Sequence, residues 1–209
     1  MAKVKICGIT NLIDAKIAID AGADALGFNF SKESPRYVSP IDAQIIIRQL
    51  PVKAWNVGVF VNELPAEVLK IARLASLDTL QFHGDEDENY LSQFSLDEFR
   101  IIKAIRVKDI TQTESEIKRF TPLTDHLLLD GYHAVLRGGA GVSIDASLLK
   151  KLSLENAFLA GGLNSDNVFE RVQAFQPFGV DVASGVEESP RRKNETLVRA
   201  FVSAANRTC

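Results

Sequence analysis

The chain has 209 residues, 46% of them hydrophobic, and a formal net charge of −3, which allows a sizeable core in one large domain or two small ones. Charges of both signs are scattered along the sequence, which argues against the charged stripe or face that nucleic acids and membrane surfaces require. No apolar stretch approaches the roughly 20 residues that cross a bilayer, and no signal peptide is evident, so we expect a cytoplasmic protein with small-molecule partners.

Short apolar segments alternate with segments of helical spacing along the whole chain. The first apolar segment, which begins at Val4, ends in Cys7 and Gly8 and is typical of a buried strand that delivers a thiol to a loop. Strands are predicted at residues 4–7, 25–30, 56–61, 79–83, 100–105, 126–130, 157–160 and 180–183. Helices are predicted at residues 12–21, 39–50, 64–75, 86–94, 110–120, 145–152, 165–175 and 195–205.

Eight strand-then-helix units without a composition break predict a parallel sheet that closes into a (β/α)8 barrel, the TIM barrel. We expect a single domain over residues 1–209, at about 26 residues a unit, near the lower end of barrel sizes. An open doubly wound sheet is the alternative. Against it, the turn after the first strand, residues 7–10, lacks the GxGxxG fingerprint of dinucleotide-binding folds.

Polar residues at the C-terminal ends of the predicted strands are the candidates for a site, because functional groups of such a barrel gather there. These candidates are Cys7, Arg36, His83, Asp130 and the turns Gly161-Gly162 and Ser184-Gly185. The two turns follow strands seven and eight, where barrels commonly bind phosphate through backbone N–H groups and a short extra helix. Residues 186–188 are predicted to form that helix.

The glycine-rich loop after the sixth strand could supply further N–H groups to a phosphate. Gly139 and Gly141 are its candidates, and an ordinary flexible loop is the equal alternative. The Gly161-Gly162 turn has an alternative too, since glycine often does no more than permit a turn. The pairing with Ser184-Gly185 on the neighbouring strand favours phosphate binding.

Cys7 is the candidate base, because a strand-end thiol with a lowered pKa can accept a proton. The alternative is a small buried hydrophobic residue. Strand alternation places Lys5 on the face of Cys7, and Asp181 faces the same way on the last strand. A buried charge needs a partner, so we expect a structural Lys5–Asp181 pair below the site. The other cysteine, Cys209, lies in a predicted tail, and two thiols make no disulfide framework.

Three further candidates have a functional and a structural interpretation. Asp130 ends an apolar strand, where a carboxyl in a dry site can act as a general acid or can cap the following loop. Arg36 could hold a substrate carboxylate in a bidentate pair, or could be solvated surface. His83 is a type of residue that titrates near neutrality, but we expect it to have a structural hydrogen-bonding role.

Eight motifs in order along the chain carry a family resemblance. They are KICGIT at 5–10, GADALGF at 22–28, SPRYV at 34–38, VGVFV at 57–61, QFHGD at 81–85, LLLD at 127–130, LAGGL at 159–163 and VDVASGVE at 180–187. Together they resemble the phosphoribosylanthranilate isomerases of tryptophan biosynthesis nearly end to end.

The resemblance implies a (β/α)8 barrel and an Amadori rearrangement of N-(5-phosphoribosyl)anthranilate to its 1-deoxyribulose 5-phosphate derivative, with no metal or organic cofactor. By matching motif position, it implies that Cys7 is the general base and Asp130 the general acid. Arg36 would bind the anthranilate carboxylate. The backbone N–H groups of Gly162, Ser184 and Gly185 would bind the phosphate.

One segment departs from the family pattern. The family usually has a sequence like GGTGxxFDW after the sixth strand, whereas this chain has GGAGVSIDA at 138–146. The difference bears on the ordering of the loop over the substrate and on affinity, rather than on the proposed acid and base. The alternatives to the isomerase are a related phosphosugar isomerase of histidine biosynthesis and a non-catalytic phosphosugar-binding barrel. A monomer and a homodimer are both compatible with the sequence.

Overall fold

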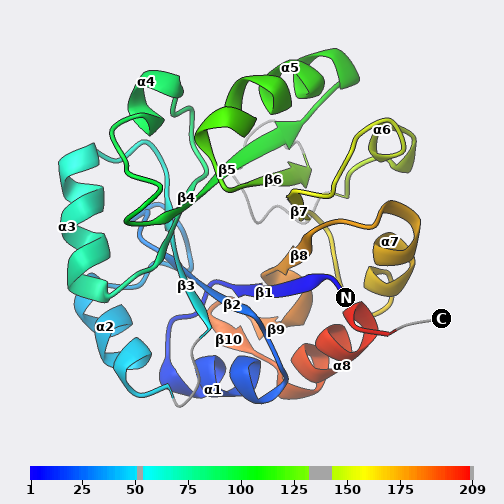
Figure 1. Cartoon of the computed structure of the whole chain (residues 1–209). Helices are drawn as coiled ribbons and strands as arrows, with labels where there is room; N and C mark the ends of the chain where they lie inside the picture. Colours follow the sequence, from blue (N-terminus) through cyan, green and yellow to red (C-terminus); the bar gives the residue numbers. More distant parts are fainter. Residues whose placement is uncertain (51–53, 132–142, 208–209) are drawn as a thin grey trace.

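The computed structural model describes residues 1–50, 54–131 and 143–207, and its centre is a closed barrel of eight parallel strands in sequential order (Figure 1). Each strand pairs with its neighbours in the sequence, and the first pairs with the eighth. The strands are β1 (Lys3–Cys7), β2 (Ala25–Asn29), β3 (Trp55–Phe60), β4 (Thr79–Phe82), β5 (Arg100–Val107), β6 (His126–Gly131), β7 (Ala157–Leu159) and β8 (Gly179–Val182). The predicted TIM barrel is confirmed, and the open doubly wound sheet is excluded.

Helices surround the barrel in chain order (Figure 1). They are α1 (Leu12–Asp20), α2 (Pro40–Arg48), α3 (Pro65–Ala75), α4 (Glu88–Leu91), α5 (Ile110–Phe120), α6 (Ala146–Leu149), α7 (Val168–Phe175) and α8 (Glu195–Ala205). Sequence chemistry sets their starts: the side chains of Asn11, Ser39, Asp109 and Asn194 each accept a hydrogen bond from a backbone N–H of the first turn. No helix within the described ranges is both long and apolar enough to cross a bilayer.

Alternation along the strands divides the core into two layers. Side chains that point outward pack beneath the helices, as the cluster containing Val4, Leu26 and Phe82 does. Side chains that point inward fill the barrel, and a second cluster joins Val57, Ile102 and Phe158 there. Inward positions nearer the C-terminal ends of the strands are polar, and these form the site described below.

An aromatic group closes the interior at the N-terminal end of the barrel. The rings of Trp55, His126 and Phe178 stack on one another, with 3.9 Å between the centroids of His126 and Phe178. The guanidinium of Arg100 lies 4.2 Å from the centroid of the Trp55 ring. The burial of the His126 ring lowers its pKa.

Three predicted helices are shorter than expected. Side-chain oxygens accept backbone N–H groups where two of them were expected to begin, and the last turn of the third is a tighter i to i+3 turn. The segment predicted at 86–94 is helical at Glu88–Leu91, since Asp87 is its N-cap. The segment at 145–152 is α-helical at Ala146–Leu149 and continues in tighter i to i+3 turns. The segment at 165–175 begins at Val168, because Asn164 Oδ1 accepts the N–H groups of Asp166 and Asn167.

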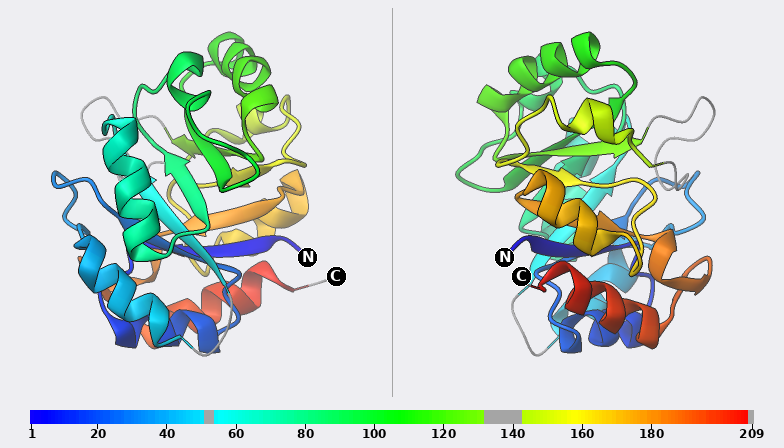
Figure 2. Two further views of the ribbon diagram at one scale, coloured as in Figure 1. Left: turned by 60° about the vertical axis from the view of Figure 1, so that its left-hand side comes forward. Right: turned by 90° about the vertical axis from the view of Figure 1, so that its right-hand side faces the viewer.

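The short helix predicted at 186–188 is wrong in its position. A 3-10 helix, η2 (Ser184–Val186), directly follows β8, and the next residues form the strand β9 (Glu187–Ser189). This strand pairs antiparallel with β10 (Arg192–Lys193), so its backbone groups are used by a hairpin rather than by a helix. The right-hand view of Figure 2 shows this hairpin at the end of the barrel toward which β1 runs.

Candidate functional site

A polar cavity of about 340 Å³ lies at the C-terminal ends of the strands. Inward side chains from β1, β4, β6 and β8 form its floor, and the loops that follow β2, β7 and β8 form its rim. The predicted site residues that line it are Cys7, Arg36, His83, Asp130, Gly161, Gly162, Asp181, Ser184 and Gly185. The predicted Gly139 and Gly141 lie outside the described residues.

Below the cavity, the predicted Lys5–Asp181 pair is present. The two residues are register partners across β1 and β8, and Lys5 Nζ lies 2.8 Å from Asp181 Oδ1. Lys5 is completely buried. Burial opposes its charged form, but the charge and the hydrogen bond of Asp181 act in the opposite direction, and the pKa of Lys5 is raised. The ammonium group therefore stays charged beneath the site.

Cys7 stands at the end of β1, where the backbone leaves the strand through Gly8 at a φ of 81°. Burial raises the pKa of the Cys7 thiol, while the positive charges of Lys5 and Lys193 act in the opposite direction. The lowered pKa that would make a free thiolate is therefore absent from this structure. The thiol is close-packed as well: a Cβ on Gly27 of β2 would lie 2.6 Å from its sulfur.

Asp130 and His83 face each other inside the cavity from β6 and the end of β4. Asp130 Oδ1 accepts the backbone N–H of Gly131 at 2.9 Å, which is the capping contact expected as the alternative to catalysis. The other oxygen, Oδ2, lies 3.3 Å from His83 Nε2. The predicted hydrogen bond of His83 is made by its other ring nitrogen, because Gln81 Nε2 lies 3.0 Å from Nδ1.

Arg36 is held by a buried carboxylate instead of being solvated. Its Nε and Nη2 donate to the two oxygens of Glu187 at 2.9 and 2.7 Å. Lys193 Nζ lies 3.0 Å from Glu187 Oε1 and donates to the Ala183 carbonyl. Burial opposes the charged form of Glu187, but the two cations outweigh it and lower the pKa of its carboxyl. The guanidinium is thus fixed at the cavity rim.

The glycine turns after β7 and β8 bring backbone close to the cavity. Gly161 and Gly162 have φ values of 85° and 64°, which residues other than glycine rarely adopt. The Gly162 carbonyl accepts a hydrogen bond from Asn167 Nδ2 at 2.9 Å, which fixes the turn. A Cβ on Gly185 would collide with the carbonyl oxygen of Leu163, so the two turns pack against each other. This close approach is what glycine at 185 permits.

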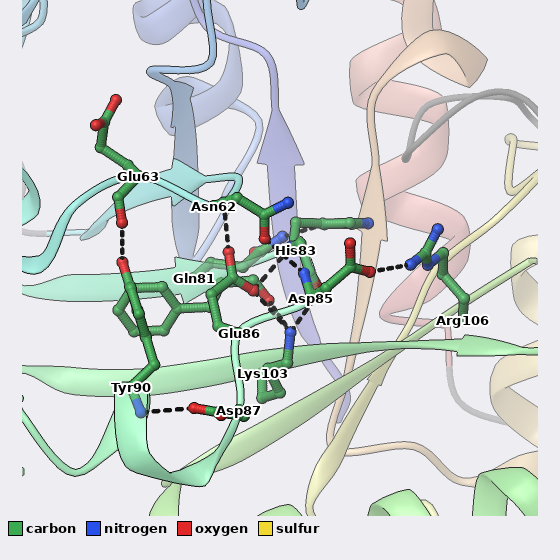
Figure 3. Close-up of polar contacts among 12 residues, drawn as sticks. Asn62, Glu63, Gln81, His83, Asp85, Glu86, Asp87, Tyr90, Lys103 and Arg106 are labelled. Atoms are coloured by element: carbon green, nitrogen blue, oxygen red, sulfur yellow. Dashed lines mark hydrogen bonds and ion pairs between the residues drawn. The ribbon is translucent and has the colours of Figure 1, made fainter.

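An ion pair on the outer face of the barrel ties the loops that follow β3 and β4 to the strand β5 (Figure 3). Lys103 Nζ lies 2.8 Å from Glu86 Oε2, and both side chains are buried. Glu86 Oε2 also accepts the N–H of Gly84, and Oε1 accepts the N–H of Asn62. These contacts fix the backbone on the C-terminal side of His83.

Sequence reasoning missed three residues of this site: Gln81, Glu187 and Lys193. The alternation of Thr79, Gln81 and His83 along β4 was a usable signal for Gln81, because three polar residues share the inward face. Glu187 belongs to a motif noted in the sequence, but its partner Arg36 is 151 residues away. No local pattern marks Lys193. Within the described ranges, no group of three or more metal-ligating side chains could hold a metal ion.

The closed barrel with a polar cavity at the C-terminal ends of its strands places this protein among the (β/α)8-barrel enzymes. The family model for N-(5'-phosphoribosyl)anthranilate isomerase matches residues 4–204. The chain belongs to this family.

Individual relatives agree with the family model. The N-(5'-phosphoribosyl)anthranilate isomerase of Rubrobacter xylanophilus is 45% identical over 98% of this chain and 99% of its own. A phosphoribosyl anthranilate isomerase solved in complex with reduced 1-(o-carboxyphenylamino)-1-deoxyribulose 5-phosphate is 36% identical, covers 98% of both chains and has a TM-score of 0.83. Monomers generated from the dimeric isomerase of Thermotoga maritima are 35% identical over 98% of both chains, with a TM-score of 0.84.

Proposed function

We propose that this protein converts N-(5'-phosphoribosyl)anthranilate to 1-(2-carboxyphenylamino)-1-deoxyribulose 5-phosphate in tryptophan biosynthesis. Membership of the isomerase family and the relative solved with a reduced form of that product support this activity. The histidine-pathway isomerase is the less favoured alternative, because the relatives reported above are named for the anthranilate reaction. The observation that carries the proposal is that Cys7 and Asp130 line one cavity from β1 and β6.

The reaction needs one acid and one base near the same sugar. Asp130 donates a proton to the furanose ring oxygen, the bond from that oxygen to C1 breaks, and the anthranilate nitrogen forms a protonated Schiff base with C1. Cys7 then removes the proton from C2, and the electron pair of that C–H bond forms a C1–C2 double bond. The electron pair of the C=N double bond returns to nitrogen at the same time, which gives an enaminol. A proton added at C1 and one lost from the C2 hydroxyl give the ketone. The same atoms remain in the product.

The positive charge of the bound intermediate counteracts the effect that raises the pKa of Cys7 in the free enzyme. Burial holds the free enzyme's thiol in its neutral form, and Lys5 counteracts part of that effect. The protonated Schiff base adds a positive charge next to the sulfur, which favours the thiolate when it is needed. Lys5 and Asp181 thus keep a structural role beneath the base.

Arg36 binds the anthranilate carboxylate in this proposal. Glu187 occupies the Nε and Nη2 groups, so the guanidinium is oriented before substrate arrives and Nη1 remains for the substrate carboxylate. The phosphate at the other end of the substrate is bound by the backbone N–H groups of Gly161, Gly162, Ser184 and Gly185. All four residues line the same cavity, which supports this assignment. Two anion sites thereby fix both ends of the substrate, with the sugar between them.

Following the fluorescence of phosphoribosylanthranilate with purified protein tests the proposal. We expect the signal to decay as substrate is consumed. Binding without consumption would leave the non-catalytic phosphosugar-binding barrel. We further propose a single-domain cytoplasmic enzyme that works as a monomer or homodimer without a cofactor, and light scattering of the purified protein distinguishes the two assemblies.

A further inference from the structure

Two buried polar atoms near the proposed acid have no hydrogen-bond partner within the described part of the chain. They are Oε1 of Gln81 and Nε2 of His83. Gln81 is 1% exposed and His83 9% exposed, and both side chains line the cavity from neighbouring inward positions of the fourth strand and its end. A buried polar atom without a partner costs free energy, so a pair of them in one cavity requires an explanation.

The orientation of the Gln81 amide indicates where the histidine proton lies. The amide nitrogen of Gln81 lies 3.0 Å from His83 Nδ1 and can only donate, so Nδ1 must accept. A neutral imidazole that accepts at Nδ1 carries its proton on Nε2. A Gln81 amide turned by half a rotation would reverse this result and leave Nε2 as an acceptor. The ring nitrogen of His83 that carries the proton is therefore the property to be measured.

The Nε2–H group faces Oδ2 of Asp130, the oxygen that does not accept the Gly131 N–H. Oδ1 of Asp130 is used by the Gly131 N–H, whereas Oδ2 lies 3.3 Å from His83 Nε2 without the alignment of a hydrogen bond. Catalytic hydrogen bonds are often long or misaligned in a free enzyme and tighten when substrate binds.

We propose that Gln81 and His83 are a positioning pair for Asp130, in which Gln81 fixes the tautomer and the His83 Nε2–H stabilises Oδ2 as it becomes negative. This inference rests on the proposed isomerase, in which Asp130 gives its proton to the ring oxygen. The donor acts as charge develops on Oδ2, so its effect belongs to the transition state and appears in kcat.

The loop network beyond His83 keeps the pair in place. Gly84, the next residue, donates its N–H to Glu86 Oε2 at 2.9 Å, and a Cβ at position 84 would collide with the side chains of Glu86 and Asn62. Figure 3 labels Gln81 and His83 together with Glu86 of the loop that follows them and its ion-pair partner Lys103. The imidazole thus projects from a backbone segment that is anchored on the outer face of the barrel.

Matched substitutions at position 83 separate the donor from the rest of the side chain. His83→Gln places an amide N–H where Nε2 stood, whereas His83→Asn reaches only to the place of Nδ1. We expect His83→Asn to lower kcat roughly 10²-fold with little change in KM, as for loss of one donor to a developing anion, and His83→Gln to retain most of kcat. Equal losses in the two variants, or full kcat in His83→Asn, would overturn the proposal.

A double-mutant cycle tests whether the two residues act together. Gln81→Leu removes the donor that sets the tautomer and should lower kcat in the same direction as His83→Asn. The double variant should be no slower than His83→Asn, because the tautomer has no meaning once the imidazole is gone. Losses that multiply would mean two independent effects and would contradict the pair. Circular dichroism of each variant checks folding.

¹⁵N NMR of the histidine rings measures which ring nitrogen is protonated and does not depend on turnover. The His83 signals, assigned by their disappearance in His83→Asn, should show the proton on Nε2 in the wild-type protein and a mixture of tautomers in Gln81→Leu. A wild-type proton on Nδ1 would overturn the inference. A wild-type protein that shows the Nε2–H tautomer but consumes no substrate would contradict the proposed function and leave the tautomer assignment standing.

Discussion

Arg36 and Glu187 form a two-pronged ion pair between the loop after β2 and the strand β9, with both guanidinium contacts at 2.9 Å or less. The stem of Arg36 lies over Gly8, where any Cβ would collide with it, so this pair fixes the guanidinium directly beside the strand end that carries Cys7. Arg36 and Cys7, the proposed carboxylate-binding residue and the proposed base, are thus neighbours in the structure.

Removal of the charge of Glu187 should weaken substrate binding. In Glu187→Gln the guanidinium loses one partner, Lys193 loses its counter-ion, and the buried charges left behind destabilise the fold by about 3–5 kcal/mol. We expect KM to rise about 10-fold with a smaller change in kcat. The guanidinium of Arg36 loses its orientation, whereas the proposed acid and base stay unchanged. Steady-state kinetics measures both.

Its control is Glu188→Gln, which removes an exposed carboxylate paired with Arg192 on the same hairpin. This variant should leave KM and stability unchanged, since surface pairs contribute little. Arg36→Met should also chiefly raise KM. An unchanged KM in Arg36→Met would remove that residue from the substrate site.

Loss of the acid or the base should act on the chemical step. Cys7→Ser and Asp130→Asn should each lower kcat by on the order of 10²-fold or more, as expected for general acid–base groups. The matched control for the thiol is Cys209→Ser, which changes the other cysteine of the chain and should keep full activity. Near-wild-type kcat in Cys7→Ser or Asp130→Asn would refute the role of that residue.

The ionisation of Cys7 should lie above the ordinary range of a thiol in the free enzyme, because burial raises its pKa. The ultraviolet absorbance of the thiolate, followed against pH and corrected with Cys7→Ser, measures it directly. kcat/KM should rise with pH through the same midpoint, since the base must be deprotonated. A thiolate already formed at neutral pH would contradict the burial argument.

The Lys5–Asp181 pair should contribute to stability over a defined pH range. The folded-state pKa of Lys5 is raised above the unfolded value near 10.5, so its contribution is complete below that value and is lost as pH rises through the folded pKa. Lys5→Met leaves the Asp181 carboxylate without its partner and should destabilise the fold by about 3–5 kcal/mol at neutral pH, less at strongly alkaline pH. Urea unfolding at several pH values measures the difference.

The more exposed pair Lys3–Asp24, with a 2.7 Å contact and with Lys3 two residues before Lys5 on β1, is the control. Lys3→Met should cost less than about 1 kcal/mol, as solvent screens that pair. Exchange of Lys5 and Asp181 for each other should recover much of what either single change loses. Independent, additive losses would show that the two residues do not act as a pair.

Strand alternation was enough to predict the Lys5–Asp181 pair beneath the site, although Gln81 was missed. The side chains of Lys5 and Asp181 met because inward positions on adjacent parallel strands follow from period and register alone. The barrel itself followed from the eightfold order of strands and helices. The roles proposed for Arg36 and Asp130 came from the family resemblance, since each had an ordinary structural interpretation in the sequence.

The rim could not be predicted in the same way, because its contacts join loops far apart in the chain. Glu187 finds Arg36 across 151 residues, and Lys193 reaches the site from a hairpin where a helix was expected. The ends of the short helices were also missed, since single side chains such as Asp87 decide where a helix begins. Loop geometry is a product of tertiary contacts and leaves little periodic signal.

The aromatic stack of Trp55, His126 and Phe178 has a consequence for engineering and for thermal adaptation. It lies at the end of the barrel opposite Cys7, so substitutions there should change the free energy of unfolding without touching the residues that line the cavity. Heat resistance can therefore be adjusted at one mouth of the barrel while selection for turnover acts at the other. Stability can thus be changed at the aromatic stack without a change at the cavity, whereas a substitution at Glu187 should change both stability and KM.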